Sequence, residues 1–326
     1  KKVYVSTDDA YVTGRIHTVA AKVSGTVKAL RVADNQFVKK DDLLAEIDEK
    51  DYAVKLREAE SALQSEQSRL LEISSRKDVA RKQLAETRHR IESARASLKL
   101  QEAQRKQADL DLKRADRLRA KEILPEERLE KAKTAYDVAV AQVDAAREQL
   151  KQAVASYETQ KSLIAQSESA YEAQGAVVKQ KEEARKSEEL RRDYTRIYAP
   201  ADGFVTRRSL EEGNQIQAGQ PLMAVVPLTD VWVVANFKET QIERVRPGQK
   251  VRIRVDTYPG RAFEGRVDSI MAGTGSVFSL FPPENATGNY VKVVQRIPVK
   301  IVLDQNADPE HILRVGMSVE PTIITR

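Results

Sequence analysis

A seven-residue repeat of apolar side chains occupies the middle of this chain and constrains its fold more than any other feature. Between residues 56 and 115, large apolar residues recur at most seventh positions, and mainly small or polar residues stand three positions later. A second series with the same spacing runs from residue 129 to residue 178. This spacing defines the a and d positions of a left-handed coiled coil. The a positions are Leu56, Leu63, Leu70, Lys77, Leu84, Ile91, Leu98, Arg105 and Leu112 in the first series, and Leu129, Tyr136, Val143, Leu150, Tyr157, Ile164, Tyr171 and Val178 in the second.

The two series are nearly equal in length, and Pro125 lies near the midpoint between them. A proline disrupts a helix interior but is tolerated in the first turn, so we place the turn near residues 121–126, with Pro125 opening the second helix. The series then form an antiparallel hairpin over residues 51–193, about 100 Å long at about 1.5 Å per residue. Three basic residues interrupt the seam, where they set the register or extend past it into water, or else line a transport conduit. They are Lys77, Arg105 and Arg185.

The hairpin interrupts an internal repeat of short β-strand patterns. Gly25 corresponds to Gly203 at an offset of 178 residues, and the offset persists without a gap as far as Ile47 and Val225. Apolar and polar residues alternate in both copies, which predicts half-buried strands with turns between them. Two such halves that complete each other resemble the biotinyl/lipoyl carrier fold. We therefore assign residues 16–50 and 194–227 to one split domain.

In carriers of that fold, the two halves meet at a hairpin that bears the modified lysine. The corresponding junction here runs from Ile47 to Asp51 and contains Lys50. Neither a Glu-Ala-Met-Lys nor an Asp-Lys-Ala motif is present, and the chain leaves this junction into the long insertion. We therefore expect no swinging-arm lysine. A lipoyl or biotin carrier subunit of an enzyme complex is the main alternative function.

Period-two alternation returns after Leu228 and predicts a small antiparallel β-barrel over residues 228–326. We expect residues 1–15 to form an N-terminal strand that joins this barrel. Residues 273–289 are rich in Gly, Ser, Pro and Asn and are too long for a hairpin turn, so this loop is either functional or simply mobile. The predicted fold class is α+β, with a coiled-coil hairpin inserted in a split lipoyl-like domain and a C-terminal barrel.

The composition excludes most kinds of chemistry. The chain has no cysteine, which excludes disulfides, zinc–thiolate sites and thiol nucleophiles. Its 3 histidines show no metal-ligand spacing, and no Walker, G-x-S-x-G or dinucleotide-binding motif occurs. The 55 basic and 49 acidic residues are interleaved, so the net charge of +6 forms no stripe for nucleic acid. We expect no enzyme activity, no cofactor, no metal and no nucleic-acid partner.

The split lipoyl-like domain, the helical hairpin at its junction and the following barrel together resemble the HlyD-type membrane fusion proteins. Three stretches are similar to the EmrA type within that family: residues 7–12, 236–241 and 286–296. The resemblance implies a periplasmic adaptor of a tripartite multidrug efflux pump. It implies an inner-membrane anchor, formed by an N-terminal helix that is absent from this chain. It also implies a major-facilitator drug exporter in the inner membrane, a TolC-like channel in the outer membrane, and several adaptor copies packed side by side.

Related adaptors carry an Arg-x3-Leu-x6-Ser pattern at the hairpin tip, where it contacts the channel. Here Arg114 and Leu118 match the pattern, and Pro125 stands at the serine position. The resemblance therefore assigns channel docking to these tip residues, with the serine contact replaced. In the long barrel loop, Phe278, Asn285 and Asn289 are the candidates for contact with the exporter. Two further alternatives are an adaptor for an ABC-type protein secretion system and a structural coiled-coil protein with β caps.

Overall fold

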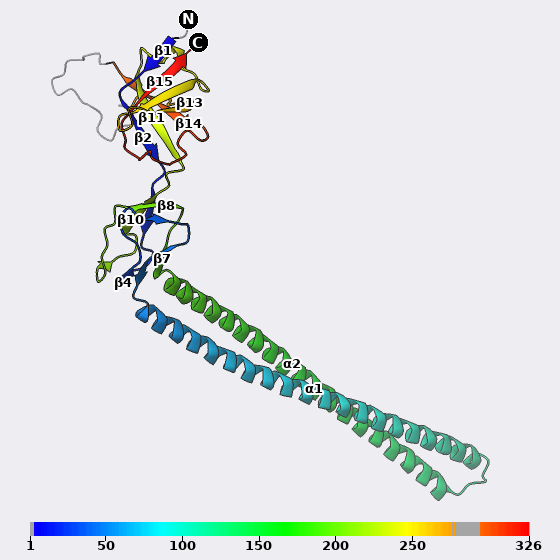
Figure 1. Ribbon diagram of the computed structural model, residues 1–326. Coiled ribbons are helices and arrows are strands. Elements are labelled where there is room, and N and C mark those ends of the chain that lie inside the picture. Colours follow the sequence, from blue (N-terminus) through cyan, green and yellow to red (C-terminus); the bar gives the residue numbers. More distant parts are fainter. Residues whose placement is uncertain (1–2, 276, 278–293, 326) are drawn as a thin grey trace, which may run out of the picture. The chain divides into compact units, whose positions relative to one another are not determined.

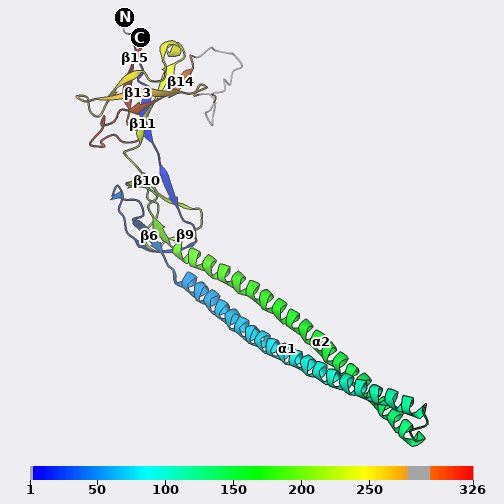
Figure 2. The same ribbon diagram turned by 90° about the vertical axis from the view of Figure 1, so that its right-hand side faces the viewer.

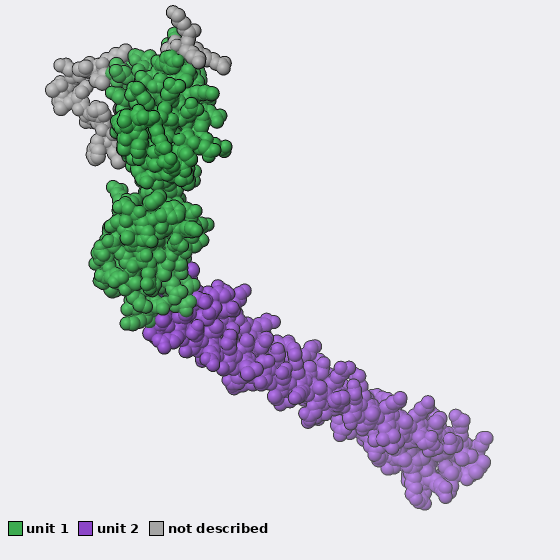
Figure 3. Space-filling model, viewed as in Figure 1, with its two compact units in different colours: residues 1–51, 191–326 green, residues 52–190 purple. Residues whose placement is uncertain are grey.

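The structure is a computed structural model that describes residues 3–275, 277 and 294–325 of the chain. It divides into two compact units, one made of residues 1–51 and 191–326 and the other of residues 52–190 (Figure 3). Within the described residues, the first unit holds all the β-strands, and the second holds nearly all of two long helices. The predicted α+β class, with a hairpin between β domains, is therefore confirmed.

Seven antiparallel strands of the first unit form a barrel, in the order β1-β15-β12-β13-β14-β11-β2 (Figure 1). They are β1 (Val3–Ser6), β2 (Ala10–Gly14), β11 (Val231–Lys238), β12 (Lys250–Val255), β13 (Ala262–Ile270), β14 (Arg296–Leu303) and β15 (Val319–Thr325). The sheet closes where Tyr11 forms a bridge with Ser318. At the same place Val12 donates to the Met317 carbonyl and accepts from the Gly316 amide. This contact joins β2 to the residues just before β15 and so closes the sheet into a barrel.

Side-chain alternation explains the barrel core. In β12 the side chains are alternately exposed and buried along the strand, as a sheet with one face in a core requires. The inward side chains of all the strands meet in one apolar cluster. Its fully shielded members include Phe237, Ile253, Ile301 and Ile323. A short 3-10 helix, η1 (Ile242–Arg244), follows β11.

The remaining strands form two four-stranded sheets, in the orders β3-β10-β8-β5 and β7-β6-β4-β9. Each sheet mixes strands from before and after the helices, so neither half of the repeat is a sheet by itself. The strands are β3 (His17–Ala20), β4 (Gly25–Leu30), β5 (Phe37–Val38), β6 (Leu43–Ile47), β7 (Arg196–Tyr198), β8 (Gly203–Thr206), β9 (Gln215–Ile216) and β10 (Pro221–Val226).

The two halves are related by the repeat down to single hydrogen bonds. Gly25 pairs with Ile216, and Gly203 pairs with Val38, which is the same pair with the two halves exchanged. The turn backbones follow the same rule: the Asn35 amide donates to the Val205 carbonyl, and the Gly213 amide donates to the Val27 carbonyl, both at 2.9 Å. The offset of 178 residues therefore describes a pseudo-twofold axis.

The two long helices are α1 (Lys50–Arg119) and α2 (Glu126–Asp193), which lie side by side in both views (Figures 1 and 2). Every predicted a and d position from Leu56 to Ala115 is buried or half-buried, and most of the other positions in this stretch are exposed. The same holds for the seam of α2. The most buried of these residues are Leu56, Ile91, Ala139, Val143, Ala146, Ile164 and Gln174. The heptad register is confirmed.

Polar contacts cross the seam without breaking its register. The Lys77 ammonium lies 3.8 Å from the centre of the Tyr171 ring, a cation–π contact between two a positions. The Gln174 side-chain amide donates to the Glu66 carboxylate at 2.6 Å, and that of Gln160 donates to the Ala80 carbonyl at 3.3 Å. The two contacts are two heptads apart on each helix, from Glu66 to Ala80 on α1 and, in the opposite chain direction, from Gln174 to Gln160 on α2. The polar residues thus connect the two helices in one antiparallel alignment.

Candidate functional site

The tip of the hairpin connects Arg119, the last residue of α1, to Glu126, the first residue of α2. The Glu122 amide donates to the Arg119 carbonyl at 2.8 Å, and the Ile123 amide donates to the Leu118 carbonyl at 3.1 Å. Glu122 has a φ angle of 59°. These bonds form a Schellman motif around a left-handed residue, with glutamate at the place usually taken by glycine. The motif ends α1 and begins the reversal of the chain.

The structure places the three predicted tip residues as follows. Arg114 is on the exposed face of α1, and its guanidinium lies 3.2 Å from the Asp111 carboxylate. Such an exposed pair contributes little to stability. Leu118 lies one turn further along α1 and is 39% exposed. Pro125 lies just before α2, and its carbonyl accepts a hydrogen bond from the Arg128 amide at 3.1 Å.

Ile123 is the tip residue that the sequence reasoning did not single out. Its side chain is 68% exposed, more than that of Leu118. In a Schellman motif the side chains at these two positions usually pack together. Leu118 and Ile123 thus form the apolar end of the tip, and Arg114 lies one turn before them. The turn contains no apolar core that could bury the Ile123 side chain. In the sequence, an apolar residue in the turn two positions before Pro125 is the feature that could have indicated an exposed apolar tip.

Described residues from the three stretches that carry the EmrA-type resemblance meet on the barrel. Asp9, Asn236 and Arg296 come from one stretch each. The Asn236 side-chain amide donates to the Asp9 carboxylate at 3.1 Å, and the Arg296 guanidinium lies 2.8 Å from the same carboxylate. Spacing along the chain could not predict this cluster, because its members are joined only by the pairing of β2, β11 and β14. The loop residues Phe278, Asn285 and Asn289 lie outside the described residues.

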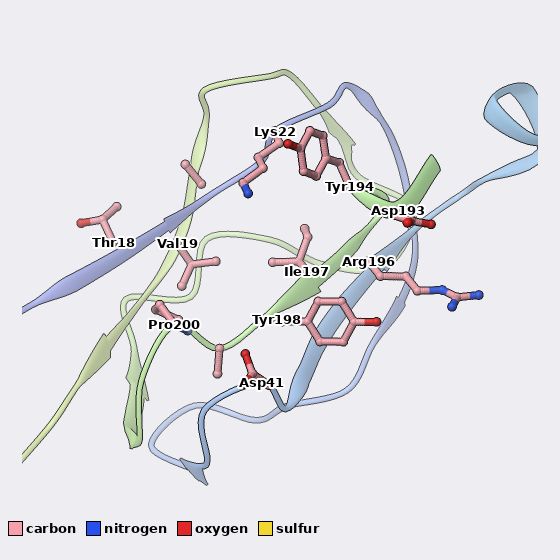
Figure 4. Close-up of a pocket in the computed structure, with 12 residues that line it drawn as sticks. Thr18, Val19, Lys22, Asp41, Asp193, Tyr194, Arg196, Ile197, Tyr198 and Pro200 are labelled. Carbon is pink, nitrogen blue, oxygen red and sulfur yellow. The ribbon is translucent and has the colours of Figure 1, made fainter. Parts of the chain in front are cut away.

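A cleft of about 490 Å³ lies in the split domain, beside β3 and β7 (Figure 4). The Lys22 ammonium lies 4.5 Å from the centre of the Tyr194 ring, and Arg196 and Tyr198 also line the cleft. Lys50, the lysine at the carrier-type junction, is the first residue of α1, and its amide donates to the Asp48 carboxylate at 3.1 Å. It therefore belongs to a capped helix start rather than to a β-turn.

Most of the shifted pKa values among the described residues lie on exposed ion pairs. The Arg81 guanidinium donates a hydrogen bond to the Glu168 carboxylate, which raises the pKa of Arg81, and this pair connects the two helices at 2.8 Å. A hydrogen bond from Arg261 lowers the pKa of the Glu310 carboxyl on the barrel. Both directions are those expected when an opposite charge stabilises the ionised form. These shifts indicate ion pairing at the protein surface.

Neither a metal site nor a membrane span is found in the part of the chain that the structure describes. No group of three or more His, Asp or Glu side chains in this part could hold a metal ion. No helix there combines the length and the apolar character needed to cross a bilayer.

With the geometry established, comparison with known proteins identifies the family. The family described as "RND MFP, barrel-sandwich hybrid domain" matches residues 15–228, which is more than half of the chain. The chain belongs to the membrane fusion proteins. A second description, "CusB-like, beta-barrel domain", matches residues 230–276 of this membrane fusion protein. The predicted resemblance to the HlyD-type family is confirmed.

Named relatives match over a shorter stretch. The fatty acid resistance protein FarA of Neisseria gonorrhoeae is 52% identical over 132 residues, which are 40% of this chain and 34% of FarA. The multidrug export protein EmrA of Escherichia coli is 51% identical over 132 residues, with the same shares of both chains. The matched stretch thus spans about a third of the length of these curated relatives.

The fold is also seen in a solved structure. The crystal structure of MacA from Actinobacillus actinomycetemcomitans aligns with all of this chain and 80% of its own, with a TM-score of 0.55 at 22% identity. At that identity the likeness concerns the fold alone.

Proposed function

We propose that this membrane fusion protein is the periplasmic adaptor of a tripartite multidrug efflux pump. In this function it connects a major-facilitator exporter in the inner membrane to a TolC-like channel in the outer membrane. The observation that carries the proposal is the hairpin, two helices of 70 and 68 residues that end in a tip with exposed apolar side chains. At about 1.5 Å per residue each helix is about 100 Å long, which suits a spacer between two membranes.

The family and the relatives support the same function. The relatives are named for export of drugs and for resistance to drugs and fatty acids. We further propose that the chain catalyses no reaction and that energy for export comes from its partner. Its proposed location is the periplasm, held to the inner membrane by a helix outside this chain. Several copies packing side by side would seal the path between exporter and channel.

We propose the following division of labour, with the domain boundaries expected from the sequence. Residues 51–193 reach toward the channel, and the tip near residues 121–126 docks on it. The split domain of residues 16–50 and 194–227 holds the base of the hairpin. The barrel of residues 228–326, joined by the strand within residues 1–15, faces the exporter. Its long loop, with Phe278, Asn285 and Asn289, is proposed as the exporter contact.

The double variant Arg114→Glu, Leu118→Ser tests the docking proposal in cells that depend on this pump. Both side chains are exposed, and exposed substitutions usually change stability by no more than about 0.5 kcal/mol. We expect folded protein, lost drug resistance and lost crosslinking to the outer-membrane channel. Crosslinking to the inner-membrane exporter should persist, because the barrel is unchanged.

A matched control uses the same spacing two turns earlier on the same helix. Lys106 and Leu110 are also exposed and also four residues apart, and Leu110 is 45% exposed. The variant Lys106→Glu, Leu110→Ser should keep full resistance. Equal resistance in both variants would contradict tip docking. Modification of Lys50 by lipoate or biotin, detected as a mass shift, would favour a carrier subunit instead, and copurification with an ABC transporter would favour a protein secretion system.

A further inference from the structure

A second cleft, of about 610 Å³, lies between the split domain and the part of the barrel just before β15, which contributes Arg314 and Val315. Its volume is within the range of about 300–1,000 Å³ that is typical of small-molecule sites. The apolar part of its lining comes from Phe204, Val226, Leu228 and Val315, with Ile16 at 52% exposure. The cleft therefore offers an apolar surface that is open to a ligand.

The pseudo-twofold repeat shows that the fold does not require the aromatic side chains here. The Phe204 ring contacts the Phe37 ring edge-to-face, with 5.3 Å between their centres, and Phe37 is 51% exposed. At the offset of 178 residues, the counterparts of Phe37 and Phe204 are Gln215 and Thr26. Those two form a polar pair, with a hydrogen bond of 2.8 Å between their side chains. The same place in the fold thus holds a polar pair in one half of the repeat and, beside the cleft, an aromatic pair in the other half, in which Phe37 is exposed and Phe204 is half-buried.

Two arginines supply the polar part of the cleft. Arg314 holds its guanidinium 5.6 Å from the centre of the Phe204 ring and donates from Nη1 to the carbonyl of His311. Arg207 also lines the cleft and is exposed. Among the described residues, neither guanidinium is paired with a carboxylate. The nearby Asp34 pairs with Arg208 instead, at 3.5 Å. Two unpaired positive charges beside an apolar wall favour a negatively charged ligand with an apolar body.

We propose that this cleft binds an amphipathic organic anion, an aliphatic carboxylate whose chain packs against Phe204 and whose head group meets Arg207 and Arg314. The adaptor would then bind such compounds itself, in addition to joining its partners. The proposal does not depend on the pump function, because the cleft is formed by one chain.

Calorimetric titration of the purified chain with dodecanoate, below the concentration at which it forms micelles, tests the proposal. Dodecyltrimethylammonium, with the same alkyl chain and the opposite charge, and acetate, with the head group alone, are the matched probes. We expect one site for dodecanoate and no binding of the other two. Arg207→Gln with Arg314→Gln should weaken dodecanoate binding at least about tenfold, the size expected for lost hydrogen bonds to a charged group.

Two further variants separate the cleft from general effects. Phe37→Gln with Phe204→Thr installs the polar pair of the other half, so the split domain should stay folded while dodecanoate binding is lost. Arg252→Gln removes one exposed arginine from β12, away from the cleft lining, and should leave the affinity unchanged. Equal binding of the cationic probe, or unchanged affinity in the arginine double variant, would overturn the proposal.

Discussion

The buried seam of the hairpin allows a stability prediction from one pair of valines in α2. Val143 is 1% exposed and occupies an a position, whereas Val138 is 51% exposed. Val143→Ala removes two carbons from the seam, which costs about 1.6 kcal/mol at about 0.8 kcal/mol per buried CH₂, before any cavity is counted. Alanine has the better helix propensity and offsets up to about 0.7 kcal/mol of this. We therefore expect a net loss of about 1 kcal/mol.

Val138→Ala is the matched control, because the substitution and the helix are the same. Only about half of its side chain is shielded from water, so the burial loss is about 0.8 kcal/mol and the gain in helix propensity nearly cancels it. Urea unfolding followed by circular dichroism at 222 nm reports on the hairpin, since α1 and α2 carry nearly all the helix of the described residues. The urea concentration at the midpoint of unfolding should fall for Val143→Ala and stay the same for Val138→Ala. The slope of the free energy of unfolding against urea concentration should be unchanged in both variants. Equal midpoints for the two variants would refute the seam as described.

Two further substitutions test the hairpin and the split domain separately. Leu84→Asp places a carboxylate at a half-buried a position and should lower the melting temperature of the helices while the β domains stay folded. Leu71→Asp, at a position that is 70% exposed, should change the melting temperature little. A larger decrease for Leu71→Asp than for Leu84→Asp would contradict the heptad register. Gly203→Ala would bring a Cβ atom to 2.7 Å from the backbone of Val226, so we expect a loss of about 1–3 kcal/mol in denaturant unfolding of the split domain. Gly260→Ala, in the barrel turn between β12 and β13, where a Cβ meets nothing within 4 Å, should leave the stability of its own domain unchanged, and a loss as large as that of Gly203→Ala would argue against the close approach.

The sequence predicted the hairpin and the repeat well because both are periodic. The heptad pattern predicts which side chains of a helix are buried, and it assigns Val143 and Ile91 to the seam. The repeat was equally informative, because an offset that continues without a gap transfers every contact of one half to the other. Gly25 and Gly203 illustrate this, since each pairs with the corresponding residue of the opposite half.

The contacts that the sequence did not predict join segments with no common period. The cluster of Asp9, Asn236 and Arg296 depends on the order in which three distant strands pair. The aromatic pair of Phe37 and Phe204 breaks the repeat, because the symmetry of the two halves predicts a polar pair there. At the tip, the exposure of Ile123 follows from the Schellman motif, in which a glutamate adopts the conformation that usually signals glycine.

The most direct test of the adaptor proposal is photo-crosslinking from the hairpin tip in living cells. A photoreactive residue at Ile123, at the exposed apolar end of the tip, should form a covalent product with the outer-membrane channel. The same residue at Val54, in the first turns of α1 and 44% exposed, should form none with the channel. A channel product from Ile123 alone is the predicted result. Absence of that product from Ile123, in cells where the pump confers resistance, would contradict the proposal that the hairpin tip docks on the channel.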